Sequence, residues 1–170
     1  MEATASKPKL GALVWMRIAD QAYAIPVTDV REILPLPELI AVPAGPNLLA
    51  GFLNLGGRLV PVVQLSRLLD LPDQEPDLWT PLLLVCMEHQ RMALMVDRVT
   101  RIVQPDDYVL RPLPPDHVFN DCTTDLVEAD GQTALLLAID RLLLAKETET
   151  LADLTKREEN RLQQLAGQPP

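Results

Sequence analysis

The sequence predicts an all-β fold with short helices, in which two similar halves of about five short strands each share one apolar core. The chain of 170 residues is 48% apolar but only 4% aromatic, so it can build a domain-sized core from aliphatic side chains. Its apolar segments are short and are separated by Gly, Pro and Asp turn signals. The same order of segments begins again near the middle of the chain, and a charged tail with a helical pattern follows.

Residues 10–77 form the predicted first half, after a flexible lead over residues 1–9. Its opening elements are two strands and a short helical turn, at 10–18, 22–27 and 28–34. Thr28 or Asp29 suits the N-cap of that turn, because both side chains accept hydrogen bonds from backbone N–H groups. A proline-rich loop follows, with an extended stretch from Leu39 to Val42.

The stretch GFLNLGGRLVPVVQL, residues 51–65, predicts a β-hairpin that turns at Gly56 and Gly57. Glycine is favoured there because such a turn needs positive φ at both central residues. The second strand of the hairpin is nearly all apolar, so we expect it to be covered on both faces. A short helix from Ser66 follows, and an acidic loop at 70–77 divides the chain.

Residues 78–145 form the predicted second half. It contains two further hairpins and a proline-rich loop: strands at 80–89 and 91–99 around His89 and Gln90, the loop at 104–117, and a hairpin over 125–143 that turns at Asp130 and Gly131.

The two halves align as an internal repeat. A shift of 69 residues places AIPVTDVREIL over ALMVDRVTRIV, so that Ala24 meets Ala93, and a shift of 74 residues places Gly57 over Gly131. One half is too small to bury its apolar faces alone. We therefore expect two halves packed face to face, or two small barrels that share a core and hide their sheet edges.

The tail, residues 146–170, is charged, and its leucines predict a helix over about 147–166. These leucines form two pairs at i,i+3 spacing: Leu151 with Leu154, and Leu162 with Leu165. Two interpretations are open. The helix packs one edge on the domain, or it docks on a partner or on a second copy of the chain.

The net charge of −9 and the six aromatic residues argue against a nucleic-acid module, which would need a basic groove with stacking aromatic side chains. A β-barrel ligand- or nucleic-acid-binding module is nevertheless the alternative function. The charge also argues against an anionic membrane surface, and no apolar run approaches the roughly 18 residues of a membrane span.

No catalytic constellation or cofactor motif is present, and Asp106, Asp107 and Asp116 lack the regular spacing of a Ca²⁺ loop. We therefore expect neither an enzyme nor a metal site.

The two cysteines have no spaced Cys or His partners, so they predict neither a zinc site nor a disulfide framework. Cys86, in PLLLVCM, is expected to be a small buried side chain, and Cys122 is expected in a loop. The first residues lack the pattern of a signal peptide. A reducing cytoplasm is the expected location.

Four segments in this order resemble the CheW-like domain family of bacterial chemosensory coupling proteins: YAIPVTDVREIL, GFLNLGGRLVPVVQL, MALMVDRV and ALLLAIDRLL. The resemblance covers about residues 10–145. It implies two five-stranded β-barrels side by side with a shared apolar core. It also implies a non-catalytic scaffold without cofactors. Such a scaffold couples the cytoplasmic tip of a methyl-accepting chemoreceptor to the CheW-like regulatory domain of the histidine kinase CheA in chemotaxis. The resemblance leaves the oligomeric state open.

The resemblance implies a receptor-facing region at seven positions: Val30, Glu32, Leu39, Asn54, Gly56, Gly57 and Arg58. Family members usually carry Arg at the position of Gly56, where it can pair with the acid that corresponds to Glu32. Without that guanidinium, Glu32 must pair with Arg31 or Arg58 or stay solvated. The family's Asp near the end of the hairpin is Gln64 here. These departures imply a partner shifted from the standard chemotaxis pair, such as one of a pilus-motility or surface-sensing system.

Five residues have structural interpretations of their own. Val30 is expected to contact the core more than a receptor, and Asn54 is expected to cap the hairpin turn. Asp97 is expected to make a structural hydrogen bond, and His89 to be a solvated turn residue. Trp79 is either an interface anchor, since Trp is enriched in binding hot spots, or a partly buried residue at the joint between the halves.

Overall fold

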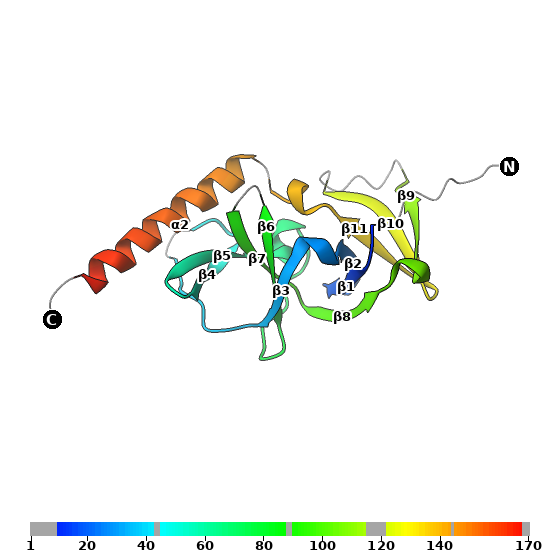
Figure 1. Cartoon of the computed structure of the whole chain (residues 1–170), viewed down its shortest axis with the longest axis horizontal. Coiled ribbons are helices and arrows are strands. Elements are labelled where there is room, and N and C mark those ends of the chain that lie inside the picture. The colour runs from blue at the N-terminus through cyan, green and yellow to red at the C-terminus, as the bar shows by residue number, and fades with distance from the viewer. Residues whose placement is uncertain (1–9, 43–44, 88–89, 115–121, 144, 168–170) are drawn as a thin grey trace.

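The computed structural model describes residues 10–42, 45–87, 90–114, 122–143 and 145–167. Within these ranges the chain forms eleven strands, three 3₁₀ turns, one short helix and one long C-terminal helix (Figure 1). The predicted mostly-β fold with a C-terminal helix is confirmed. The expectations for residues 1–9, for His89 and for Asp116 lie outside the described residues.

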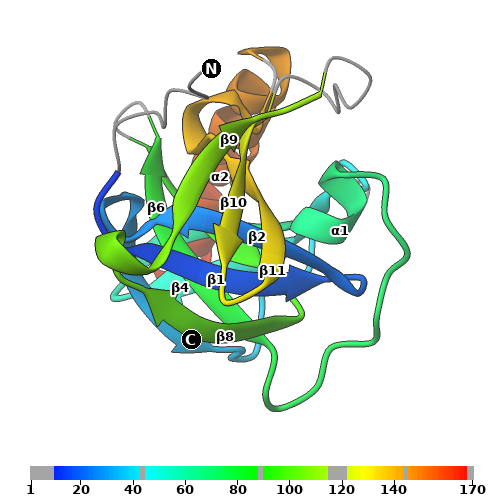
Figure 2. The same ribbon diagram turned by 90° about the vertical axis from the view of Figure 1, so that its right-hand side faces the viewer.

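The strands form two sheets. The six-stranded sheet has the order β8-β1-β2-β11-β10-β9, and its strands are labelled in Figure 2: β1 (Leu13–Ile18), β2 (Gln21–Pro26), β8 (Arg98–Val103), β9 (Val109–Pro112), β10 (Thr123–Ala129) and β11 (Gln132–Leu137). The five-stranded sheet has the order β3-β6-β7-β5-β4: β3 (Val30–Pro35), β4 (Leu49–Leu55), β5 (Arg58–Gln64), β6 (Pro81–Met87) and β7 (Gln90–Met95). The helical elements are η1 (Val27–Asp29), α1 (Leu65–Leu68), η2 (Pro105–Asp107), η3 (Ile139–Arg141) and α2 (Ala145–Ala166).

The strand registers confirm the predicted internal repeat. Each sheet contains one parallel pair, and the two pairs are equivalent: Ala24 lies opposite Leu136, and Ala93 lies opposite Val62. The predicted shift of 69 converts Ala24 into Ala93, and the shift of 74 converts Val62 into Leu136. Two loop hydrogen bonds repeat in the same way. The Gln64 N–H donates to the Leu48 carbonyl (2.9 Å), and its equivalent at Ala138 donates to the Cys122 carbonyl (2.8 Å).

The two halves exchange one strand each. β3, from the first half, pairs with β6, and β8, from the second half, pairs with β1. Each sheet therefore contains strands from both halves, so the halves do not correspond one to one with the sheets. Among the described residues, no pairing joins the two end strands of either sheet, and closure into barrels stays a prediction.

The core lies between the sheets and continues into the hollow of each one. One buried cluster draws on both sheets and on α2, and two smaller clusters lie within the individual sheets. Strand β1 shows the arrangement: Val14 and Met16 point into the shared cluster, whereas Leu13 and Trp15 point into the hollow of the six-stranded sheet. On β5, Leu59 and Val60 divide in the same manner, so the near-continuous apolar run is covered on both faces as predicted. The common apolar core is therefore confirmed.

Three segments differ from the sequence prediction. Residues 28–34 are not a helical turn, because η1 ends at Asp29 and β3 follows; its β-branched residues suit an extended edge. Residues 91–99 are not one strand, because the chain turns between β7 and β8. The proline-rich segment 104–117 contains β9, an edge strand on which Pro112 is tolerated.

Asp97 fixes the turn between β7 and β8. Its carboxylate accepts a hydrogen bond from the Ala19 N–H (2.7 Å), and its own N–H donates to the Arg17 carbonyl (3.1 Å). The predicted structural hydrogen bond of Asp97 is therefore confirmed, and it ties this turn to the β1–β2 hairpin.

The prediction for Cys86 is wrong, whereas Cys122 lies in a turn just before β10, as predicted. Cys86 is exposed, whereas Cys122 is buried in the shared core. Cys86 lies near the end of β6, where strand alternation turns its side chain outward.

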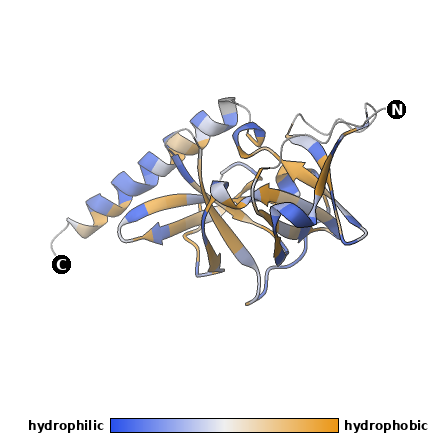
Figure 3. Cartoon of the chain, turned by 45° about the vertical axis from the view of Figure 1, so that its right-hand side comes forward, coloured by the Kyte–Doolittle hydropathy of each residue, from blue (hydrophilic) through white to orange (hydrophobic). Residues whose placement is uncertain are grey.

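Helix α2 lies along the five-stranded sheet and contacts β5 (Figure 1). Leu151 is 1% exposed within the shared core, and Leu154 and Leu162 pack against that core. The Glu159 carboxylate accepts a hydrogen bond from the Leu59 N–H (3.2 Å). Most of the helix is hydrophilic (Figure 3), and Leu165 stays exposed. The interpretation in which one edge of the helix packs on the domain is confirmed. No helix among the described residues is long and apolar enough to cross a membrane.

Candidate protein-binding surfaces

Four of the seven predicted receptor-facing residues meet at the β4–β5 turn. Asn54 is the exposed residue near the end of β4, and its side-chain oxygen accepts a hydrogen bond from the Gly57 N–H (2.8 Å). The predicted turn cap is therefore confirmed. Gly56 and Gly57 have φ angles of +62° and +92°, which glycine adopts without strain. A Cβ at Gly56 would meet nothing within 4 Å, so a side chain at this position would extend into solvent next to Arg58.

Val30 and Glu32 lie on β3, at one edge of the five-stranded sheet. Val30 is half-buried and packs against the shared core, as its structural interpretation predicted. The Glu32 side chain is exposed, and no hydrogen bond or ion pair joins it to Arg31, Arg58 or any other described residue. Of the three possibilities for Glu32, the structure shows the solvated one.

The β4–β5 turn and β3 do not belong to neighbouring strands. β4 forms the opposite edge of the sheet from β3, with β6, β7 and β5 between them in the hydrogen-bonded order. Leu39 lies in a third place, against the backbone of β4, where an added Cβ at Gly51 would lie 3.1 Å from the Leu39 Cβ. The structure thus divides the seven residues into a strand edge, a hairpin turn and a loop.

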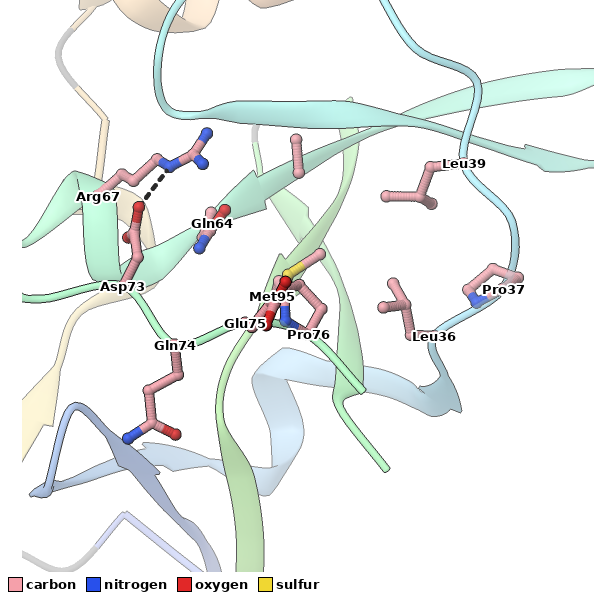
Figure 4. Close-up of a pocket in the computed structure, with 11 residues that line it drawn as sticks. Leu36, Pro37, Leu39, Gln64, Arg67, Asp73, Gln74, Glu75, Pro76 and Met95 are labelled. Carbon is pink, nitrogen blue, oxygen red and sulfur yellow. Dashed lines mark hydrogen bonds and ion pairs between the residues drawn. The ribbon is translucent and has the colours of Figure 1, made fainter. Parts of the chain in front are cut away.

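The loop that contains Leu39 borders a cavity of about 620 Å³ (Figure 4). Its apolar wall comes from the 36–39 loop, β4 and β7, with the residues Leu36, Pro37, Leu39, Ala50 and Met95. The opposite, mostly polar wall comes from the end of β5, α1 and the loop after α1, with the residues Gln64, Arg67, Asp73, Gln74, Glu75 and Pro76. Gln64, which replaces the family's Asp, presents a neutral amide to this cavity. The sequence identified only Leu39 and Gln64 of this set, because the other residues come together through loops that no local pattern predicts.

Asp73 fixes the polar wall of the cavity. Its carboxylate accepts hydrogen bonds from the Ser66 hydroxyl (2.8 Å) and from the Arg67 guanidinium (3.0 Å). These two hydrogen bonds hold the pKa of Asp73 below its ordinary value. Arg67 also donates to the Asn47 carbonyl (2.9 Å). Through Arg67, α1 therefore connects the loop before β4 with the loop that follows α1.

Two exposed isoleucines occupy equivalent places on the exchanged strands. Ile33 on β3 is 41% exposed and Ile102 on β8 is 53% exposed, and the repeat places one over the other. The sequence prediction missed both strand edges, because residues 28–34 were expected to be helical and 91–99 to be one strand. The β-branched residues of VTRIV were the signal for β8.

Trp79 is not the partly buried residue of the second interpretation, because 76% of it is exposed. The adjacent Leu78, which the sequence prediction did not single out, is 86% exposed. Both lie on the loop between α1 and β6, just before β6 begins. The first residue of β6, Pro81, pairs with Pro35 of β3. The interpretation of Trp79 as an interface anchor stays a prediction.

Comparisons with known proteins agree with this architecture. A family model described as "CheW-like domain" matches residues 12–147. The chain is 27% identical over 147 residues to a probable chemotaxis protein CheW of Rhizobium etli, with 86% of this chain and 90% of the relative covered. It is 24% identical to the chemotaxis protein CheW of Thermotoga maritima, with 84% and 94% covered. The crystal structure of the scaffolding protein TtCheW from Thermoanaerobacter tengcongensis superposes with a TM-score of 0.72 at 18% identity, over 86% of this chain and 96% of that one.

Proposed function

The chain belongs to the CheW-like domain family, and from this we propose that it is a non-catalytic adaptor of a bacterial chemosensory pathway. In this role it couples the cytoplasmic tip of a methyl-accepting chemoreceptor to the regulatory domain of a CheA-type histidine kinase. The observation that carries the proposal is the family match over residues 12–147, which spans both sheets and the shared core. The relatives named as chemotaxis proteins match over nearly their whole length.

We propose that the receptor contacts three places: the β3 edge, the β4–β5 turn, and the loop that connects β3 to β4 and contains Leu39. These contain the seven proposed residues: Val30, Glu32, Leu39, Asn54, Gly56, Gly57 and Arg58. The exposure of the β3 edge supports this proposal, because an edge strand offers free backbone groups and alternate side chains to a partner. Exposed Ile33 adds an apolar contact, and unpaired Glu32 adds a charge without competition from a neighbouring cation.

We further propose that the receptor or the kinase belongs to a specialised system. Two departures support this. At position 56 the chain lacks the guanidinium of the family, and at position 64 it has a neutral amide in place of a carboxylate. Both changes alter charge at possible contact surfaces while the fold is retained, so they bear on partner choice rather than on folding.

A binding assay with purified proteins tests the adaptor function. The chain is titrated with the kinase regulatory domain and with a receptor-tip fragment, each encoded in the same genome, and then with both together. We expect binding to each and a ternary complex. Glu32→Arg should weaken binding of the receptor tip without weakening that of the kinase domain. The matched control is Asp107→Arg, which reverses an exposed charge on η2, the turn between β8 and β9. Absence of binding to both proteins would reject the adaptor function, and equal effects of the two variants would reject the β3 surface.

A further inference from the structure

The loop between α1 and β6 presents two large apolar side chains to solvent. Leu78 and Trp79 are 86% and 76% exposed, more than any other large apolar residue that the structure describes. The tip of the loop projects beyond the sheets in two perpendicular views (Figure 1, Figure 2). Residues 72–79 are all exposed, and the loop returns to the core only at Thr80.

This tip is an ordered turn. The Asp77 carboxylate accepts a hydrogen bond from the Trp79 N–H (2.7 Å), and the Asp77 N–H donates to the Thr80 hydroxyl (2.9 Å). The Thr80 carbonyl in turn accepts from the Leu36 N–H (3.0 Å), which joins the turn to the end of β3. At its other end the loop is held by the Asp73 hydrogen bonds to Ser66 and Arg67. The backbone that carries the exposed pair is therefore held in place before any partner arrives, which reduces the entropy lost on binding.

The charge around the pair restricts the kind of partner. The loop carries four carboxylates, and two of them have cationic neighbours: Asp73 pairs with Arg67, and Asp77 lies 4.0 Å from Arg98. Within the described residues, Asp70 and Glu75 have no ion pair. A second copy of this chain carries the same net charge of −9 and is repelled, as is an anionic membrane. A matching surface has an apolar pocket that admits an indole and a border of Lys or Arg side chains.

We infer that Leu78 and Trp79 form a docking anchor that inserts into such a pocket on the kinase regulatory domain. This inference rests on the proposed adaptor function and names the determinant of one of its two contacts. A projecting indole needs a concave site, whereas the chemoreceptor tip, which the family resemblance implies is helical, presents a convex surface. A domain of the fold described above offers concavities of the required size, such as the cavity of about 620 Å³ in this chain; the basic border must come from the kinase domain's own residues.

Titration of the full chain with the purified kinase regulatory domain tests this inference. Trp79→Ala should weaken binding by about tenfold or more, and Leu78→Ala should weaken it less. The control is Leu165→Ala, an exposed leucine on α2, which should leave the affinity unchanged. Raising the salt from about 50 mM to about 300 mM should weaken wild-type binding, because a basic border is screened. The receptor-tip fragment should bind Trp79→Ala and the wild type equally well.

Several outcomes overturn the inference. If the wild type binds the kinase domain and Trp79→Ala binds equally well, the anchor is rejected while the adaptor function stands. Salt-independent binding rejects the basic border. Three results would assign a different occupant and so reject the kinase domain. Trp79→Ala could weaken binding of the receptor tip rather than of the kinase domain. The wild type could cosediment with phosphatidylglycerol vesicles, or form a dimer in sedimentation analysis, in a way that Trp79→Ala abolishes. If the wild type binds neither protein, the adaptor function is rejected and the assignment of the kinase domain falls with it.

Discussion

Truncation of Leu151 tests whether α2 is an integral part of the core. Leu151 is 1% exposed and contacts the cluster that both sheets share. Leu151→Ala removes three buried carbon atoms, which corresponds to about 2.4 kcal/mol of lost transfer free energy at roughly 0.8 kcal/mol each. The space left behind adds to this loss, because the surrounding strands can close only part of it, so we expect a total of about 2–5 kcal/mol.

The assay is urea unfolding followed by circular dichroism, with the free energy of unfolding taken from the linear extrapolation. For a chain of 170 residues, a loss of about 3 kcal/mol corresponds to a Tm that falls by roughly 6–12 °C. The control is Leu165→Ala on the same helix, where 58% exposure predicts a change below about 0.5 kcal/mol. The reasoning is refuted if both variants unfold at the same urea concentration as the wild type, since α2 would then be separable from the domain.

Three further predictions concern the β4 strand, its turn and the loop after α1. Gly56→Arg should raise affinity for a standard receptor tip relative to Gly56→Ala, by roughly tenfold for a contact of about 1.4 kcal/mol. Both variants bear the same backbone strain at φ +62°, and equal affinity in a titration would show that position 56 does not face the receptor. Gly51→Ala should lower the free energy of unfolding by about 1–3 kcal/mol, because the added Cβ would lie 2.8 Å from the Ile40 carbonyl oxygen; unchanged urea unfolding would contradict this. Acidification should release the loop after α1. The pKa of Asp73 is lower in the folded state, so its stabilisation is complete above the unfolded-state pKa near 4 and is lost as the pH falls through the folded-state pKa. Hydrogen exchange of residues 72–80 measures the release, and Asp73→Asn should already show it at neutral pH; equal protection in variant and wild type would refute it.

The sequence predicted best what depends on a few adjacent residues. The β4–β5 and β10–β11 turns follow from Gly56-Gly57 and Asp130-Gly131, because only such residues readily adopt the positive φ values that these hairpins need. The internal repeat was also accessible, since equivalent strands keep the same apolar residues to fill equivalent hollows. The equivalent residues of the two halves could thus be predicted, and the structure shows their equivalence in two parallel pairings, Ala24 with Leu136 and Ala93 with Val62.

The strand edges were harder to predict, for a physical reason. β3 and β8 each bury one side only in part, so their apolar residues are interrupted by exposed ones such as Glu32 and Thr100. A short sequence of this kind fits a helical turn or the continuation of a strand equally well. What makes β3 a strand is its pairing with β6, about fifty residues further along the chain, and a local pattern does not contain that information. The same holds for Leu78, whose exposure depends on how Asp77 and Thr80 fix the turn.

The strand exchange also has a consequence for how an adaptor of this fold can hold two partners. β3 carries the proposed receptor contacts Val30 and Glu32, yet it is supported by β6 from the other half. The loop that bears Trp79 connects the halves and joins the end of β3 through the Leu36–Thr80 hydrogen bond. A ligand that shifts β3 would therefore act on β6 and on this loop through backbone hydrogen bonds rather than through a flexible hinge. Two partners docked on the β3 edge and on the loop tip would be held in one fixed relation, which is the mechanical requirement for a protein that joins a receptor to a kinase.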